Sequence, residues 1–380
     1  LIDSAGLRLQ EATDALNAFG EIYMKQTLAS GVIPQITAVF GTCGGGLALV
    51  PALTDSTFME GKKAKLFVNA PNALAGNEIS KCDTSDAAFQ SEEAGLVDFV
   101  GEEAEILGQI RNLVCMLPSN NEDDNSYVEC MDDLNRADAT MAACVGDSSI
   151  ALSTIADDHL FVEVKAAYAK EMVTGFLKLN GMTVGAVANR SEVYDENGEK
   201  TASFDAALSP AGCDKAAEFV NFCDAFNIPV LTLTNVNGFT ADKCSEKKIA
   251  KAAARLTYAF ANATVPKVNV VTGMAYGSAY VVMNSKALGA DITYCWPDAK
   301  IGTMDARLAA KIICDGQGAD AVNECAKEYE ALQTSAASAA RRGYVDTIIE
   351  PADTRKYVIG AFEMLFTKRE DRPAKKHGTV

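Results

Sequence analysis

The fold of this chain is decided by the stretch PQITAVFGTCGGG, which runs from Pro34 to Gly46. Its first half is rich in β-branched and aromatic residues, which favour a strand, and its second half is a loop of small residues leading toward a helix-like segment. A similar stretch, PKVNVVTGMAYGSAY, runs from Pro266 to Tyr280. The chain is therefore predicted to contain the same strand-to-turn unit twice.

Other residues recur at one spacing, which extends the repeat beyond these two stretches. Three pairs are separated by 232 positions: Gly6 with Gly238, Pro34 with Pro266, and Gly41 with Gly273. A constant separation over the whole segment indicates a duplicated domain. In the first copy, one apolar helix face is predicted from residues that step by three and four, namely Leu9, Ala12, Leu16, Phe19 and Tyr23.

Later segments continue the repeat at changed spacings, as insertions would produce. Segment 65–71 matches segment 291–297, with 226 positions between Pro71 and Pro297. Segment 95–100 matches segment 343–348 at a separation of 248 positions. Strand-like runs alternate with helix-like runs, and parallel strands need helical crossovers. We therefore expect an α/β fold with a largely parallel sheet in each copy.

The repeat predicts a first domain over 1–118 and a second domain over 151–380. An acidic stretch, 119–150, contains the run NNEDDN and is predicted to be a solvated linker. About seventy residues precede Gly238 in the second copy, counted from near Glu171, but only about five precede Gly6 in the first. The first copy is therefore expected to begin in mid-domain, as it would in a truncated or split chain.

Composition excludes several classes of partner. The chain has 380 residues, 48% of them hydrophobic, and a formal net charge of -17, which disfavours nucleic acid and anionic membranes because both need a basic face. An anionic coenzyme A ester is compatible with this charge, since backbone amides at the start of a helix bind anions. No apolar run reaches the length of a membrane span and no signal-peptide pattern opens the chain, so we expect a cytoplasmic protein.

The cysteines and histidines predict no metal site and no disulfide framework. Eleven cysteines are scattered without a C-x-x-C pair, and the histidines are His159 and His377. Cys43 lies beside the first glycine turn and is a candidate nucleophile by position. No histidine near it in the sequence would activate it, which argues against that role.

Both glycine-rich turns are candidates for binding a developing negative charge. Backbone amides that converge at the start of a helix can hold an oxyanion, and such donors contribute a large share of catalysis in acyl transfer. The alternative is a tight strand-to-helix turn with no ligand. Leu47 stands where a P-loop requires lysine, so the first turn is not a nucleotide signature.

Several segments resemble the carboxyltransferase subunits of biotin-dependent acyl-CoA carboxylases and decarboxylases, of the propionyl-CoA carboxylase β and methylmalonyl-CoA decarboxylase α type. In the first copy these segments are 1–11, 30–36 and 51–59; in the second they are 222–229, 263–268, 275–280 and Trp296–Pro297. The resemblance covers nearly the whole chain in order. It implies two tandem crotonase-like (ClpP/crotonase) domains of the β-β-α superhelix type, the first lacking its N-terminal part.

The resemblance also implies an activity and a site. Family members move a carboxyl group between carboxybiotin on a carrier protein and the α-carbon of an acyl-CoA, through CO2 and an enolate held in oxyanion holes. Carried over by motif, Gly45 and Gly46 would hold the acyl-CoA enolate, and Ser278 and Ala279 would hold the biotin ureido oxygen. The further substrate-binding residues implied are Gly44, Tyr276, Gly277 and Val281.

Three departures from the family pattern concern the second copy. Ser278 stands where glycine is common, but its amide remains a donor. Val281 replaces a frequent aspartate at a position associated with the choice of acyl chain. The run NVNGF at 235–239 differs from a D-x-P-G-F pattern, so this loop is expected to shape the biotin pocket differently. By resemblance, the propionyl-CoA and methylmalonyl-CoA pair is the preferred substrate.

The chain contains neither the Ala-Met-Lys-Met motif of a biotin carrier nor an ATP-grasp glycine loop. Biotin is therefore expected on a separate subunit or domain, and no metal is expected. The implied partners are a biotin carboxyl carrier protein, a biotin carboxylase or membrane decarboxylase subunits, and further copies of this chain in a hexamer. The alternatives are a noncatalytic scaffold subunit of such a complex and a biotin-independent crotonase-type enzyme acting on CoA esters.

Overall fold

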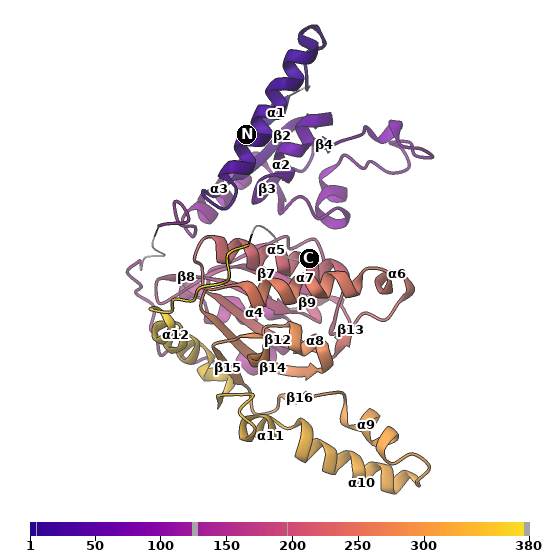
Figure 1. Cartoon of the computed structure of the whole chain (residues 1–380), viewed down its shortest axis with the longest axis vertical. Coiled ribbons are helices and arrows are strands. Elements are labelled where there is room, and N and C mark those ends of the chain that lie inside the picture. The colour runs from indigo at the N-terminus through magenta and orange to yellow at the C-terminus, as the bar shows by residue number, and fades with distance from the viewer. Residues whose placement is uncertain (5, 124–127, 196, 376–380) are drawn as a thin grey trace. The chain divides into compact units, whose positions relative to one another are not determined.

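The computed structural model describes residues 1–4, 6–123, 128–195 and 197–375, and its chain divides into two compact units (Figure 1). Unit 1 comprises Leu1–Asn125, Val164–Ala169 and Ala225–Asn227. Unit 2 comprises Ser126–Glu163, Lys170–Asp224 and Ile228–Val380. Within the described ranges, no helix has both the length and the apolar character needed to cross a bilayer.

Unit 1 is a five-stranded parallel sheet with three α-helices. Its strands are β1 (Ile2–Ser4), β2 (Ile36–Gly44), β3 (Ser56–Glu60), β4 (Lys65–Phe67) and β5 (Phe99–Gly101), in the order β1-β2-β3-β5 with β4 also on β2. Its helices are α1 (Ala12–Ala29), α2 (Leu49–Ala52) and α3 (Glu103–Val114). The predicted apolar face of α1 is only partly covered, since Phe19 and Tyr23 are half-buried but Leu16 is 60% exposed.

Unit 2 is built on an eight-stranded sheet in the order β17-β15-β14-β12-β8-β7-β6, with β16 on β14. Its strands are β6 (Phe161–Val164), β7 (Met172–Leu179), β8 (Met182–Asn189), β12 (Val230–Val236), β14 (Lys267–Tyr276), β15 (Ile292–Cys295), β16 (Lys300–Gly302) and β17 (Thr347–Ile348). Strands β7 and β8 form an antiparallel hairpin whose two turn residues, Asn180 and Gly181, both have positive φ, as a type I′ turn requires.

The described part of unit 2 also contains two small strand pairs and nine α-helices, besides short 3₁₀ and π turns. The pairs are β9 (Glu192–Tyr194) with β10 (Lys200–Ser203), and β11 (Ala207–Leu208) with β13 (Gly238–Phe239). The helices are α4 (Ser148–Ile155), α5 (Pro210–Ala225), α6 (Lys243–Glu246), α7 (Ile249–Asn262), α8 (Gly277–Val282), α9 (Ala306–Ile313), α10 (Ala319–Tyr329), α11 (Ala336–Arg341) and α12 (Thr354–Leu365).

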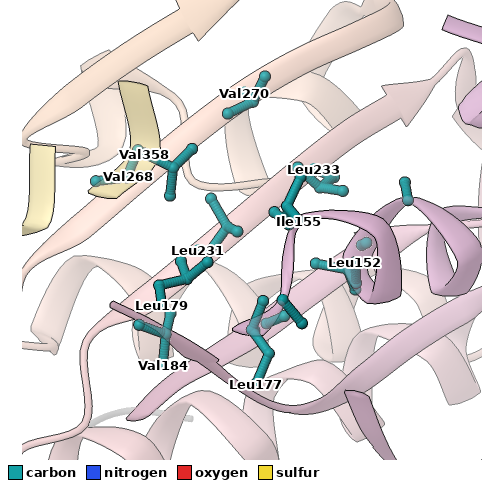
Figure 2. Packing of buried hydrophobic residues seen from close by; sticks show 14 of the residues in the cluster. Leu152, Ile155, Leu177, Leu179, Val184, Leu231, Leu233, Val268, Val270 and Val358 are labelled. Atoms are coloured by element: carbon teal, nitrogen blue, oxygen red, sulfur yellow. The ribbon is translucent and has the colours of Figure 1, made fainter. Parts of the chain in front are cut away.

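The main core of unit 2 lies between one face of the large sheet and helices α4 and α12 (Figure 2). Alternate residues of the strands, among them Leu177, Leu231 and Val268, meet Leu152 of α4 and Val358 of α12. All five side chains are fully buried. Burial of apolar surface stabilises a fold by roughly 25 cal/mol per Å². This core therefore makes the sheet a stable support for the loops at its edge.

Residues 128–150 pack differently from the solvated linker expected there. They belong to unit 2, where Met141 is buried in the main core and Asp147 caps the first turn of α4 by accepting from the Ser149 amide. Arg136 donates to the carbonyl of Ala156 at 2.9 Å, which ties this segment to the core. Apolar residues are sparse in this acidic stretch, and they differ in burial: Met141 is buried, whereas Met131 is 90% exposed and Val128 is 54% exposed. Residues 124–127 of the expected linker lie outside the described residues.

The predicted duplication is confirmed by the register of the strands. Ile2 of β1 pairs with Val39 of β2, and Thr234 of β12 pairs with Val271 of β14, so each residue has its counterpart 232 positions later. The next pairs, Ser4 with Cys43 and Val236 with Ala275, keep the same separation after the same irregularity in register. Strands β1 to β5 therefore correspond to β12, β14, β15, β16 and β17.

The prediction that segment 65–71 matches segment 291–297 is wrong. Ile36 of β2 pairs with Ser56 of β3, and its counterpart Val268 pairs with Ile292, so β15 corresponds to β3. Lys65 of β4 corresponds to Lys300 of β16, because each begins the second partner of the central strand. A proline after a short strand recurs by chance, whereas strand pairing identifies the true counterpart.

The match between segments 95–100 and 343–348 is confirmed by strand register and by a repeated hydrogen bond. Phe58 of β3 pairs with Phe99, and Tyr294 of β15 pairs with Thr347, 248 positions later. Before each outer strand, an aspartate carboxylate accepts from the backbone amide of the neighbouring strand. Asp98 accepts from Thr57 at 2.5 Å, and Asp346 accepts from Thr293 at 2.8 Å.

In both units, the central strand changes its partner at a glycine. Strand β2 pairs with β3 up to Val39 and with β4 from Thr42, and β14 makes the same change around Gly273. At this point the Asn235 side-chain oxygen accepts from the Met274 amide at 2.9 Å, as Asp3 accepts from the Thr42 amide at 3.3 Å. The side-chain oxygen replaces a backbone acceptor where the ladder is interrupted.

Glycine is required at the change of partner because the side-chain oxygen occupies the space of a Cβ atom. A Cβ on Gly273 would lie 2.6 Å from Oδ1 of Asn235, and one on Gly41 would lie 1.9 Å from Oδ1 of Asp3. Asn235 cannot yield easily, since it is buried and also donates to the Val145 carbonyl at 3.2 Å.

Gly273→Ala is expected to destabilise the protein by about 1–3 kcal/mol, because it overpacks this junction. Gly360→Ala is the matched control: Gly360 lies within α12 with no atom within 4 Å of a built Cβ, so alanine there should stabilise the helix by roughly 0.5–1 kcal/mol. The measurement is the urea midpoint of each variant. Equal midpoints for the two variants would contradict the proposed role of the glycine.

Candidate functional site

Each central strand leads into a tight turn that begins with a left-handed glycine. Gly45, with φ of +64°, follows β2 and starts the 3₁₀ turn Gly45–Ala48, which continues into α2. Gly277, with φ of +60°, follows β14 and starts α8. Glycine adopts this conformation without a steric cost because it lacks a Cβ atom, which accounts for glycine at the same place in both copies.

The three glycines of the first turn serve three different purposes. A Cβ on Gly44 would lie 2.7 Å from the Phe67 ring, so Gly44 lets β4 approach the strand end. Gly45 supplies the left-handed conformation. Gly46 is exposed, and a Cβ there would lie 3.0 Å from the Tyr23 hydroxyl of α1. The Tyr23 hydroxyl donates to the Gly46 carbonyl at 2.6 Å.

In the second turn, the predicted residues differ in their exposure. Ser278 is exposed and Val281 is 40% exposed, whereas Ala279 is buried. Tyr276 is buried at the end of β14, and burial together with the carboxylates of Asp305 and Glu330 raises its pKa. The Tyr276 hydroxyl therefore stays protonated and neutral near neutral pH. Gly277 lies close to the chain that follows β16, since a Cβ there would be 3.3 Å from the Thr303 carbonyl.

Buried polar side chains beneath α8, which are not among the residues predicted from the sequence, support the second turn. Asn269 of β14 is fully buried; it accepts from the Thr234 hydroxyl at 2.8 Å and donates to the Met283 carbonyl at 3.3 Å. This carbonyl lies just after α8 ends, so the helix is tied to the sheet. Asn269 and Thr234 each interrupt a mainly apolar strand in the sequence, and this pattern could have identified them as buried polar residues.

The register of the repeat relates the predicted amide pairs to each other. Ser278 and Ala279 correspond to Gly46 and Leu47 at the 232-residue separation, and Gly277 corresponds to Gly45. The family motif instead indicates Gly45 and Gly46 in the first turn. That pair lies one residue earlier than the counterpart of Ser278 and Ala279. By this register the counterpart of Ala279 is Leu47, a residue that the family motif does not indicate.

The exposed turns offer backbone amides and little side-chain chemistry. The first residues of a helix have amides without an intrahelical partner, and these can point at an anion. His159 lies between α4 and β6, in neither turn, and His377 lies outside the described residues. Across the described ranges, no three His, Cys, Asp or Glu side chains are grouped as metal ligands would be. The arrangement suits stabilisation of an oxyanion by preorganised amides.

The family of this chain follows from comparison with known proteins. The family described as "Carboxyl transferase domain" matches residues 1–380. The chain belongs to this family. Methylmalonyl-CoA decarboxylase subunit alpha of Propionigenium modestum is 37% identical over 404 residues, covering 100% of this chain and 75% of the relative. Propionyl-CoA carboxylase beta chain of Saccharopolyspora erythraea is 39% identical over 408 residues, covering 100% and 73%.

The solved structures agree with this assignment. Transcarboxylase 12S, solved as a hexamer with hydrolysed methylmalonyl-coenzyme A bound, matches with a TM-score of 0.91 at 37% identity, covering 100% of this chain and 74% of that one. The predicted crotonase-like α/β fold and the predicted membership of the carboxyltransferase family are both confirmed. The family match and the relatives named as carboxyltransferases show that this chain is a carboxyltransferase.

Cys43 is expected to be unreactive, which tests its alternative role as a nucleophile. It is fully buried in the unit 1 core, and burial raises the pKa of its thiol to about 11. At pH 8 roughly one thiol in a thousand would be ionised. Iodoacetamide should label the exposed Cys82, Cys115 and Cys244 well before Cys43, as peptide mass mapping would reveal. Labelling of Cys43 as fast as Cys82 would contradict this account.

Proposed function

We propose that this carboxyltransferase moves a carboxyl group between carboxybiotin on a separate carrier and the α-carbon of a short-chain acyl-CoA, with propionyl-CoA and methylmalonyl-CoA as the preferred pair. The observation that carries the proposal is the repeated turn after the central strand, within a chain that matches the family over its whole length. Relatives named for propionyl-CoA and methylmalonyl-CoA support the choice of acyl group.

The first turn is assigned to the acyl-CoA. As the thioester becomes an enolate, its oxygen gains charge, and preorganised amides stabilise that charge more strongly than they stabilise the neutral carbonyl. Gly45 and Gly46 are the donors that the family motif indicates, whereas the register of the repeat favours Gly46 and Leu47. Gly46 is common to both assignments and is exposed. Gly44 allows the close packing behind it.

The second turn is assigned to biotin, which supplies or accepts the carboxyl group when bound. The fit rests on the small residues of this turn: Gly277 is left-handed, Ser278 is exposed, and the amides of Ser278 and Ala279 lie at the start of α8. These two amides would hold the ureido oxygen. Tyr276 and Val281 flank the turn, and Val281, being 40% exposed, is assigned to the wall that selects the acyl chain.

The proposal includes partners and assembly. Biotin would arrive on a biotin carboxyl carrier protein, and the direction of transfer would depend on whether a biotin carboxylase or membrane decarboxylase subunits complete the complex. A hexamer is proposed because the related transcarboxylase 12S structure is described as one. A cytoplasmic location remains part of the proposal.

The first experiment is a transfer assay on the intact assembly. The protein is incubated with methylmalonyl-CoA or malonyl-CoA and with biotin or the biotinylated carrier, and the decarboxylated acyl-CoA is measured. Turnover that requires biotin is expected. If turnover does not require biotin, the reading as a biotin-independent crotonase-type enzyme gains support. If there is no turnover in any condition, the noncatalytic scaffold replaces the proposal.

Gly46→Pro should lower turnover by about 10²-fold or more, because it removes one amide donor to the enolate. Gly46→Ala is the matched control, since it adds a Cβ in the same crowded place, 3.0 Å from the Tyr23 hydroxyl, but keeps the amide. Both variants are checked for folding by circular dichroism and thermal unfolding. Equal turnover in two folded variants would exclude the Gly46 amide as a donor.

A further inference from the structure

The hydroxyl of Tyr23 reaches from helix α1 to the backbone of the first turn. It donates to the Gly46 carbonyl at 2.6 Å, and its ring stacks on Phe19 with centroids 6.0 Å apart. A Cβ on Gly46 would lie 3.3 Å from the Phe19 ring and 3.0 Å from the Tyr23 hydroxyl, so the absence of a side chain at Gly46 permits this contact. The aromatic pair therefore meets the turn at its exposed glycine.

The contact orients one particular amide. The Gly46 carbonyl and the Leu47 N–H belong to the same peptide group, and no peptide bond in the described residues is cis. In a trans peptide the N–H and C=O point in opposite directions, so a hydroxyl that holds the carbonyl also fixes the direction of the N–H. That N–H corresponds to the Ala279 amide of the second copy.

The first turn needs such a restraint because of its three consecutive glycines. Gly44, Gly45 and Gly46 have no Cβ atoms to limit backbone rotation. Within the 3₁₀ turn the Gly46 carbonyl accepts from the Leu49 amide, and the Tyr23 hydroxyl is a second donor to the same oxygen, from outside the turn. An oxyanion donor is effective only if its direction is set before the charge develops.

The second turn is held by other means. The residue 232 positions after Tyr23 is Arg255, which pairs with Asp214 at 2.8 Å. Ser278 and Ala279 have Cβ atoms that limit rotation, and Asn269 ties the end of α8 to the sheet. The hydroxyl contact is thus specific to the copy in which the turn is glycine-rich.

We propose that Tyr23 is a positioning residue for carboxyl transfer: its hydroxyl holds the Gly46–Leu47 peptide so that the Leu47 amide points toward the acyl-CoA enolate. This inference rests on the proposed function. The role of Tyr23 is to reduce the reorganisation of the turn during the reaction. Its loss should therefore affect kcat and leave KM for the acyl-CoA unchanged, since an amide that acts only on the developing charge contributes little to ground-state binding.

The test compares Tyr23→Phe with Tyr194→Phe in the full assembly supplied with the biotinylated carrier. Tyr194 is the matched control because its hydroxyl also donates at 2.6 Å, to Glu192, in the β9–β10 pair. Tyr23→Phe should lower kcat by about three- to tenfold, as the loss of one hydrogen bond predicts, with KM unchanged. Tyr194→Phe should keep the wild-type kcat and KM, and the two variants should lower the urea midpoint by similar small amounts.

Rescue by a conservative replacement separates positioning from packing. Site-specific incorporation of para-aminophenylalanine at position 23 keeps a hydrogen-bond donor at the ring tip and should restore most of the lost kcat. Equal kcat for Tyr23→Phe and wild type, or a kcat loss that the amino analogue does not repair, would overturn the proposal. A wild-type assembly without biotin-dependent turnover would instead contradict the proposed function, so the two failures are distinguishable.

Discussion

Both units share one constraint on the central strand. On one side the strand changes its partner in mid-course, and on its other side a side-chain oxygen of the neighbouring strand accepts a backbone hydrogen bond where the register shifts. In unit 2 the oxygen belongs to Asn235, which accepts from the Met274 amide beside Gly273. The change of partner lets one strand serve two neighbours, β15 and then β16. Its last residues are thereby carried past the first neighbour, and the tight turn begins directly beyond them.

The functional turns are a consequence of that geometry. The end of the central strand pairs with β4 or β16, and in both copies the chain then turns at a left-handed glycine. The copies then differ in what steadies the turn. Unit 1 uses a tyrosine hydroxyl on a carbonyl, and unit 2 uses a buried asparagine beneath the helix. The same backbone turn is therefore stabilised by different side chains in the two copies.

A site made of backbone amides explains why side-chain patterns say little about the chemistry. Every residue except proline has an amide, so the donors are set by conformation and not by residue type. What the residue types do control is access: Gly46 and Ser278 are exposed, while Ala279 is buried behind the turn. The same reasoning accounts for Cys43, which lies near the turn yet faces the core.

The sequence by itself determined the duplication, because a constant 232-residue separation survives wherever no insertion intervenes, and strand register repeats it residue for residue. It also determined the glycine turns and, through its motifs, the family. Only the tertiary structure decided which later segments correspond, since the proline after residues 65–70 resembles the proline after residues 291–296 although different strands precede them. The structure also decided the hydrogen bonds of Asn235, Asn269 and Tyr23. Each of these side chains contacts a residue at least 23 positions away along the chain, and no local sequence pattern encodes such a contact.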